Sequence, residues 1–284
     1  MLKRKLSVSG FWAHGVLIVA LSHGFDLQTP LTASFNEIQY VAQADKIAAL
    51  GDTSILQFNS IDSLAAEKKS VSFPSVQLNV HATTFVKSYL KQNNVTLSKV
   101  KQKSESIFKL MDSVLQKKGL PVQLKYLAVI ESNLKSTAVS RVGAVGTWQL
   151  MPSTARLLGL KVTKKYDERK QTYKSTTAAA KYLKDLYNQY GDWLLVIAAY
   201  NGGPGTVNRA IKKSGSHNFW KLQYNLPAET RMHVKRFIGT HYYFEGTGSA
   251  ATLTKAENEE HKKKIADFIS SLNPESTDFK VSAR

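Results

Sequence analysis

The spacing of apolar residues between residues 82 and 245 is the feature that most constrains the fold of this 284-residue chain. Val100, Ile107 and Leu115, for example, recur at intervals close to whole helical turns. No segment in this range alternates apolar and polar residues, which is the pattern of a half-buried strand. We therefore predict a mainly α fold.

Glycine and proline mark where the helices begin and end. Gly119 is expected to end a helix over 98–118, and Pro121 to open the next one, over 121–133. Further helices are predicted, in chain order, over 152–158, 175–190, 193–199, 206–213, 228–244 and 256–272. The expected architecture is one compact helical domain.

The chain begins with three basic residues, Lys3 to Lys5, followed by a mostly apolar run over 11–21. A basic start and a short apolar run are typical of a secretory signal peptide, whereas a membrane span needs about 20 apolar residues. We expect 1–22 to be a signal peptide and the protein to be exported. An ordinary buried helix is the alternative, and an uncleaved segment would be the expected contact with a membrane.

The remaining boundaries follow from changes in composition. Residues 23–81 are rich in Ser, Gln, Thr and Asn without a strong period, and we expect a poorly ordered leader or linker with a short helix around 36–50. The helical domain is expected over 82–245. Residues 246–284 are expected to form a charged tail that contains the last predicted helix.

Charge and cysteine content exclude some classes of site. Lys and Arg total 39 against 21 Asp and Glu, a net charge of +18, which favours nucleic acid, anionic lipid or an anionic wall polymer as partner. Charge alone does not choose among these. The chain has no cysteine, which excludes disulfides, thiolate catalysis, zinc sites of the cysteine type and an acylated-cysteine anchor.

One carboxylate stands out on the helix predicted over 121–133. Leu124, Leu127, Ala128 and Glu131 lie on one helical face, and that face is apolar until Glu131. Partial burial raises the pKa of a carboxyl, as a general acid near neutral pH requires. The alternative is a Glu131 that reaches solvent or pairs with a lysine, and periodicity does not decide between the two.

Two glycine-rich segments carry further polar side chains. The segment 143–154 forms a loop leading into a helix, and its Gln149 can donate and accept hydrogen bonds, as sugar hydroxyls require. Trp148 stacks on a sugar ring in one interpretation and packs in the core in the other. The segment 198–205 places Tyr200 and Asn201 where a helix ends, either for function or as a packed C-terminal cap. It lacks the phosphate-loop pattern.

The order of these segments resembles the soluble-type lytic transglycosylase domain, which is related to goose-type lysozyme. The matching elements are Glu131-Ser132, Gly146-x-x-Gln149-x-Met151-Pro152-x-Thr154-Ala155 and Ala199-Tyr200-Asn201. The membrane-bound lytic transglycosylase D group looks closest, on Gly146-x-Trp148-Gln149, Asp192-Trp193, Phe219-Trp220 and Leu226-Pro227-x-Glu229-Thr230-Arg231. The resemblance covers roughly 85–245. It implies a lysozyme-like helical fold.

The resemblance also implies roles for individual residues. Glu131 matches the catalytic acid and base, and Glu229 a structural position. The substrate-binding positions that it implies are Ser132, Ser140, Gly146, Gln149, Met151, Tyr200 and Asn201. Two departures are visible: His233-Val234-Lys235 stands where the family usually has Tyr and then Val-Pro, and Ser136 stands where it commonly has Pro.

The reaction that the resemblance implies uses one carboxylate. Glu131 would protonate the bond between N-acetylmuramic acid and N-acetylglucosamine in peptidoglycan, and the C6 hydroxyl would close a 1,6-anhydro ring. No metal or organic cofactor and no nucleic acid partner are expected. The expected partner is the peptidoglycan glycan strand, and the expected location is the periplasm or cell envelope. Exo- or endo-cleavage and the oligomeric state stay open.

Two other functions remain as alternatives. A hydrolytic, lysozyme-like muramidase usually needs a second carboxylate, and Asp167 and Glu168 are the next acids after the Gln149 segment. A non-catalytic peptidoglycan-binding protein would need no acid, although Glu131 is present. A nucleic-acid binder would cluster its basic residues on one face, whereas the lysines here are spread along the chain.

Overall fold

The computed structural model describes residues 74–272. Contacts divide the chain into two units, Met1–Ser70 and Val71–Arg284, and the fold below concerns the second. The signal peptide expected over 1–22 and the short helix expected around 36–50 lie outside the described residues.

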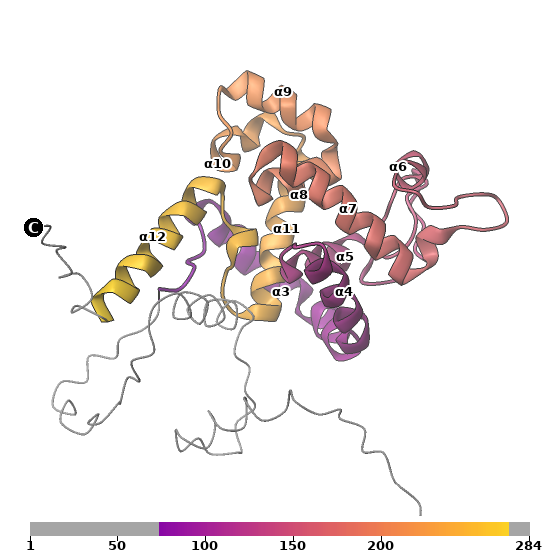
Figure 1. Ribbon diagram of the computed structural model, residues 1–284, viewed down its shortest axis with the longest axis horizontal. Coiled ribbons are helices and arrows are strands. Elements are labelled where there is room, and N and C mark those ends of the chain that lie inside the picture. The colour runs from indigo at the N-terminus through magenta and orange to yellow at the C-terminus, as the bar shows by residue number, and fades with distance from the viewer. Residues whose placement is uncertain (1–73, 273–284) are drawn as a thin grey trace, which may run out of the picture. The chain divides into compact units, whose positions relative to one another are not determined.

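The described part of the chain is helical, as Figure 1 shows. Its α-helices are α3 (Val80–Lys103), α4 (Glu105–Lys117), α5 (Tyr126–Ser132), α6 (Pro152–Leu157), α7 (Thr172–Tyr190), α8 (Trp193–Gly202), α9 (Pro204–Ser214), α10 (Phe219–Leu222), α11 (Ala228–Glu245) and α12 (Lys255–Leu272). Within residues 74–272 the only strand-like pairings are isolated bridges, at Val139–Val145, Val145–Leu150 and Val162–Asp167. The mainly α prediction is confirmed.

Two helix predictions near the start of the domain need correction. The single helix predicted over 98–118 is wrong, because α3 ends at Lys103 and α4 begins at Glu105. Between them Ser104 is buried and its hydroxyl donates to the Lys101 carbonyl, 3.0 Å away. The helix predicted over 121–133 starts as a 3-10 turn, Val122–Lys125, before α5. Apolar spacing continues through both irregularities, so the sequence pattern does not mark them.

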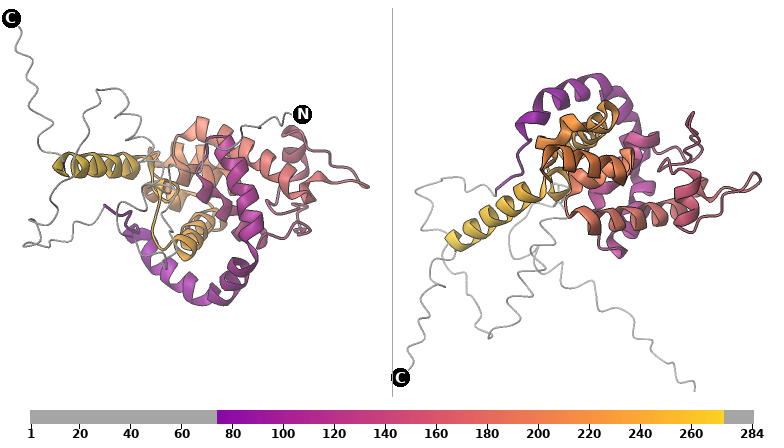
Figure 2. Two further views of the ribbon diagram at one scale, coloured as in Figure 1. Left: turned by 60° about the horizontal axis from the view of Figure 1, so that its bottom comes forward. Right: turned by 90° about the horizontal axis from the view of Figure 1, so that it is seen from above.

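Helix α8 forms the centre of the core. Leu194, Leu195, Val196 and Ile197 are all fully buried, so this helix is apolar on every side. Helices α7, α9 and α11 pack against it. Helix α11 also packs against α3 and α5, and Figure 2 shows the long α3 beside the other helices from two directions. The contact between α5 and α11 sets the position of the candidate site.

The start of the predicted charged tail is packed onto this core. Asp192 caps α8 by accepting from the Leu194 and Leu195 amides, and its other oxygen accepts from the Lys255 amide at 2.7 Å. Burial raises the pKa of Asp192 to about 6. The first turn of α12 is thereby tied to the first turn of α8. None of the helices within residues 74–272 is both long enough and apolar enough to cross a bilayer.

Candidate active site

Glu131 lies in the last turn of α5, at the end of a buried helical face. Leu124, Leu127 and Ala128 are fully buried, which confirms the apolar face predicted from their spacing. The side chain of Glu131 is 16% exposed. Two residues later, Asn133 ends the helix in the left-handed conformation at φ 51°. The carboxyl group therefore sits where a rigid helix meets a turn.

The surroundings of Glu131 favour its protonated form. Burial and, to a smaller extent, the nearby negative charge of Glu229 raise the pKa of Glu131 to about 8, and Arg236 opposes the shift. At neutral pH the group holds its proton and can donate it. Within residues 74–272 the structure gives Glu131 no lysine partner, and the near group is His233.

His233 comes from α11 and faces the same carboxyl group. Its Nε2 atom lies 3.4 Å from Oε1 of Glu131, and its side chain is only 4% exposed. Burial, reinforced by Arg236, lowers the pKa of His233 to about 4. Nε2 forms no hydrogen bond within the described part of the chain. Sequence reasoning assigned this residue no role, although it noted that 233–235 departs from the family pattern.

The loop between α5 and α6 is shaped by two of the predicted site residues. Gly146 has φ +88°, and a Cβ atom there would lie 2.0 Å from the carbonyl oxygen of Arg169. Gln149 has φ 46°, and its Nε2 donates to the Gly146 carbonyl at 2.8 Å. Both residues thus define the shape of the loop itself.

Two other predicted residues differ in how they are held. The Ser140 hydroxyl accepts from the Ala144 amide at 2.9 Å, within the same loop. Met151 stands at the start of α6 with 40% of its surface exposed. Both are reachable from solvent.

Hydrogen bonds join the loop to the helices that flank it. The Ser132 hydroxyl donates to the Thr147 carbonyl at 2.8 Å, and the Tyr200 hydroxyl donates to the Trp148 carbonyl at 2.7 Å. Burial raises the pKa of Tyr200, and the negative charge of Glu131 adds to that shift. The three segments singled out in the sequence therefore meet around Glu131. Asn201, one residue further on, is exposed.

Trp148 packs in the core. It is fully buried, and its Nε1 donates to the Thr176 hydroxyl on α7 at 2.9 Å. A side chain with no exposed surface cannot stack on a sugar ring. Of the two interpretations of Trp148, core packing is the correct one.

Sequence reasoning missed Arg169, a buried arginine that holds the loop. Its Nη1 donates to the carbonyls of Gly143 and Leu150, both at 2.9 Å. Its Nη2 pairs with Asp167 at 2.7 Å, and the arginine side chain is 6% exposed. A lone arginine two residues after an aspartate gave no signal of this role.

Both acids considered for a second catalytic carboxylate are engaged elsewhere. Asp167 is paired with Arg169, which lowers the pKa of Asp167. Glu168 pairs with Lys174 at 2.6 Å and accepts from the Lys161 amide at 2.7 Å. Each stabilises the segment before α7.

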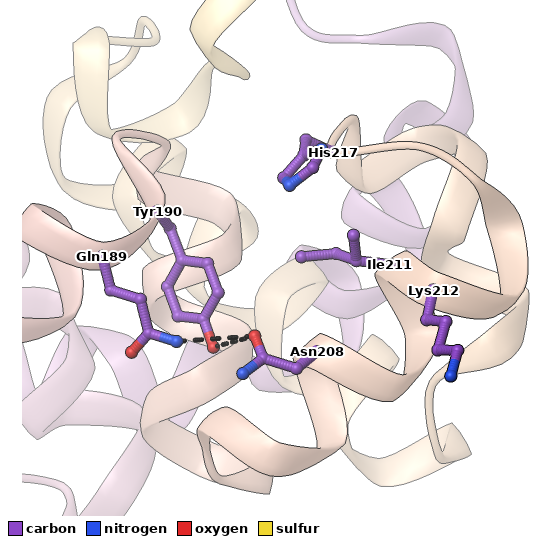
Figure 3. Close-up of a pocket in the computed structure, with 6 residues that line it drawn as sticks. All are labelled: Gln189, Tyr190, Asn208, Ile211, Lys212 and His217. Carbon is purple, nitrogen blue, oxygen red and sulfur yellow. Dashed lines mark hydrogen bonds between the residues drawn. The ribbon is translucent and has the colours of Figure 1, made fainter.

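A separate hollow lies away from these residues. Figure 3 shows it between the end of α7 and α9, with the Tyr190 ring on one side and Asn208 and Ile211 on the other. Its volume is about 260 Å³, and the Tyr190 hydroxyl is 3.0 Å from Oδ1 of Asn208. None of the predicted site residues lines it. Residues 74–272 also contain no group of three His, Asp or Glu side chains able to hold a metal ion.

Comparisons with known proteins identify the same region. Residues 110–223 match the family described as Transglycosylase SLT domain. Over 157 residues the chain is 39% identical to the membrane-bound lytic murein transglycosylase D of Escherichia coli, covering 54% of this chain and 33% of that protein. It is 38% identical over 82 residues to the transglycosylase of Enterobacteria phage PRD1, covering 29% of each.

Solved structures with a similar arrangement include the 70 kDa soluble lytic transglycosylase of Escherichia coli. The match has a TM-score of 0.46 and 26% identity, and it covers 53% of this chain and 26% of that one. The chain therefore spans about a third or less of the length of these relatives.

Proposed function

We propose that this protein is a peptidoglycan lytic transglycosylase with Glu131 as its single catalytic acid and base, because residues 110–223 match the family described as Transglycosylase SLT domain. The substrate is the glycan strand, cut between N-acetylmuramic acid and N-acetylglucosamine. The observation that carries the proposal is a buried carboxyl group, protonated at neutral pH, where the three motif segments meet.

The reaction begins with the proton on Glu131. That proton passes to the glycosidic oxygen as the bond from the anomeric carbon to this oxygen breaks, and the 2-acetamido oxygen of the same sugar stabilises the cation. The Glu131 carboxylate then takes the proton of the C6 hydroxyl, whose oxygen bonds to the anomeric carbon. The product is a 1,6-anhydro ring, and Glu131 regains its proton. An intramolecular nucleophile has a large entropic advantage over water.

The other site residues support this chemistry in two ways. Ser132 and Tyr200 fix the loop against α5 and α8, and Gly146 lets the loop pass close to the Arg169 carbonyl. Ser140, Gln149, Met151 and Asn201 are at least partly accessible to solvent and contact the sugar chain or its acetamido groups. No metal or organic cofactor takes part.

The location and the partner follow from the same proposal. The protein is exported to the periplasm or cell envelope, where peptidoglycan is found, and its net charge of +18 attracts an anionic polymer. The membrane is contacted only through an uncleaved signal segment.

The test is a digest of purified peptidoglycan with product masses measured for the wild type and for Glu131→Gln. We expect products one water lighter than a reducing muropeptide from the wild type, and a loss of roughly a thousandfold or more in the variant, because the proton donor is gone. Glu229→Gln is the matched control, since it removes a neighbouring carboxylate that is mostly exposed, and it should retain activity.

Two results would contradict the proposal. Reducing-end products would mean a muramidase that uses water. No products from wild-type protein that is folded and binds the glycan would mean a non-catalytic peptidoglycan-binding protein.

A further inference from the structure

His233 is a buried side chain that the reaction above does not use. It projects from α11 toward α5, and its Nε2 lies 3.4 Å from Oε1 of Glu131. A hydrogen bond of this kind is typically about 2.9 Å long, and Nε2 has no other partner within residues 74–272. Buried polar atoms are rarely left unpaired, and exceptions call for an explanation.

The charge state of the pair sets how strong this contact can be. At neutral pH the low pKa of His233, about 4, leaves the imidazole neutral, while the pKa of Glu131, about 8, keeps its proton in place. A neutral carboxyl oxygen is a weak acceptor, and a carboxylate oxygen is a strong one. A hydrogen bond from Nε2 to Oε1 is therefore weak before Glu131 transfers its proton and much stronger afterwards.

We propose that neutral His233 donates an Nε2–H hydrogen bond to Oε1 of Glu131 as that carboxyl group ionises, which leaves Oε2 as the oxygen that gives and takes the catalytic proton. The inference rests on the proposed function. His233 is a positioning residue, because it acts through Glu131 and does not touch the sugar. Its bond strengthens as charge develops on Glu131, and an interaction of that kind accelerates a reaction.

The other groups around the pair do not replace His233. On α11, Glu229 and Arg236 are ion-paired to each other at 2.8 Å, and both are partly exposed. On α8, the Tyr200 hydroxyl already donates to the Trp148 carbonyl. Because each has a partner, His233 is the group with an uncommitted ring nitrogen beside the carboxyl oxygen.

The test compares two variants of similar size by their pH–rate profiles on soluble peptidoglycan fragments. His233→Leu removes the donor, and we expect kcat to fall on the order of tenfold or more with little change in KM. Loss of a donor to the carboxylate raises the pKa of Glu131, so the alkaline limb of the profile should move to higher pH. His233→Gln keeps a neutral N–H donor and should restore both kcat and the position of that limb.

A second buried histidine of α11 serves as the structural control. His241 is 0% exposed, and its Nε2 contacts the Ser249 hydroxyl at 2.8 Å, apart from the predicted site residues. His241→Leu should lower the melting temperature without moving the alkaline limb.

Three outcomes would overturn the inference while wild-type activity stands. One is an unchanged kcat and limb in His233→Leu. Another is a limb that moves to lower pH, which would mean that the imidazole accepts a hydrogen bond from the acid. The third is a loss in His233→Leu that His233→Gln does not restore. A wild type that forms no anhydro product would instead contradict the proposed function.

Discussion

Among the buried ionisable groups of residues 74–272, two clusters are built in opposite ways. At the end of α5, Glu131 and His233 face each other without a hydrogen bond, and burial favours the uncharged form of both. Before α7, Asp167 and Arg169 are both charged and paired at 2.7 Å, and the arginine also donates to two carbonyls.

The difference separates a reactive group from a structural one. A buried charge with all its partners in place holds the chain in one conformation, and removing one partner is costly. A buried acid without partners keeps its proton and can transfer it. The predictions below test whether the two clusters differ in this way.

The largest effect on stability is expected at the paired cluster. Arg169→Met leaves Asp167 and the carbonyls of Gly143 and Leu150 without their donor, and we expect the free energy of unfolding to fall by about 3–5 kcal/mol. Chemical denaturation measures this. Lys174→Met is the control, because Lys174 is 46% exposed in its pair with Glu168 and should cost no more than about 1 kcal/mol. Equal losses would mean that burial of the pair has no special role.

The next effect concerns the glycine packed against Arg169. Gly146→Ala places a Cβ atom 2.0 Å from the Arg169 carbonyl oxygen at a φ of +88°. We expect the free energy of unfolding to fall by roughly 3 kcal/mol and the activity to be lost as well. Gly143→Ala is a matched control, since Gly143 has φ +84° but open space around a Cβ atom. A similar loss in both variants would assign the effect to backbone strain alone.

The burial of Glu131 and His233 should make the stability of the protein depend on pH. The folded-state pKa of Glu131, about 8, lies above its ordinary value of 4.5, so the folded protein binds more protons between these values. Stability from this group is complete below pH 4.5 and is lost as pH rises through 8. Glu131→Gln should therefore be more stable than the wild type by a margin that grows from pH 4.5 upward and reaches on the order of 3 kcal/mol by pH 7. A constant margin would contradict the raised pKa.

Below pH 6.5 the buried His233 also makes the free energy of unfolding of the wild type depend on pH. His233 has a folded-state pKa of about 4, below its ordinary value of 6.5, so its contribution to stability is lost as pH falls through 4. The difference between wild type and Glu131→Gln isolates the carboxyl group from this opposite trend.

The smallest effect is expected from the exposed neighbour of the pair. Glu229 raises the pKa of Glu131, so Glu229→Gln should move the alkaline limb of activity slightly to lower pH. Because the Glu229–Arg236 pair is 65% and 38% exposed, the loss of stability should stay within about 1 kcal/mol. A limb that stays in place or moves upward would contradict the repulsion between Glu229 and Glu131.

Sequence patterns predicted what depends on local spacing. The face formed by Leu124, Leu127 and Ala128 led to Glu131, and the ordered motifs located the loop and Tyr200. Spacing could not show that Ser104 divides a helix, since the apolar period runs through it. Nor could it choose between core and sugar for Trp148, because a buried tryptophan and a stacking one look alike in sequence.

Contacts between distant segments were also beyond the sequence. Arg169 reaches Gly143 across 26 residues, and His233 reaches Glu131 across about a hundred. The positive φ of Gln149 is a second example, since nothing in a glutamine signals a left-handed backbone. These features arise from tertiary packing, and local sequence patterns do not indicate them.

The side chains that hold the α5–α6 loop donate hydrogen bonds to main-chain carbonyls of the loop. Ser132, Tyr200 and Arg169 hold the carbonyls of Thr147, Trp148 and Leu150, so these tethers do not depend on which side chains the loop carries elsewhere. Arg141 and Val142, at the exposed turn, are therefore free to vary during evolution or in a mutant library. Substitutions there would change the outer surface of the loop without altering the hydrogen bonds that hold it.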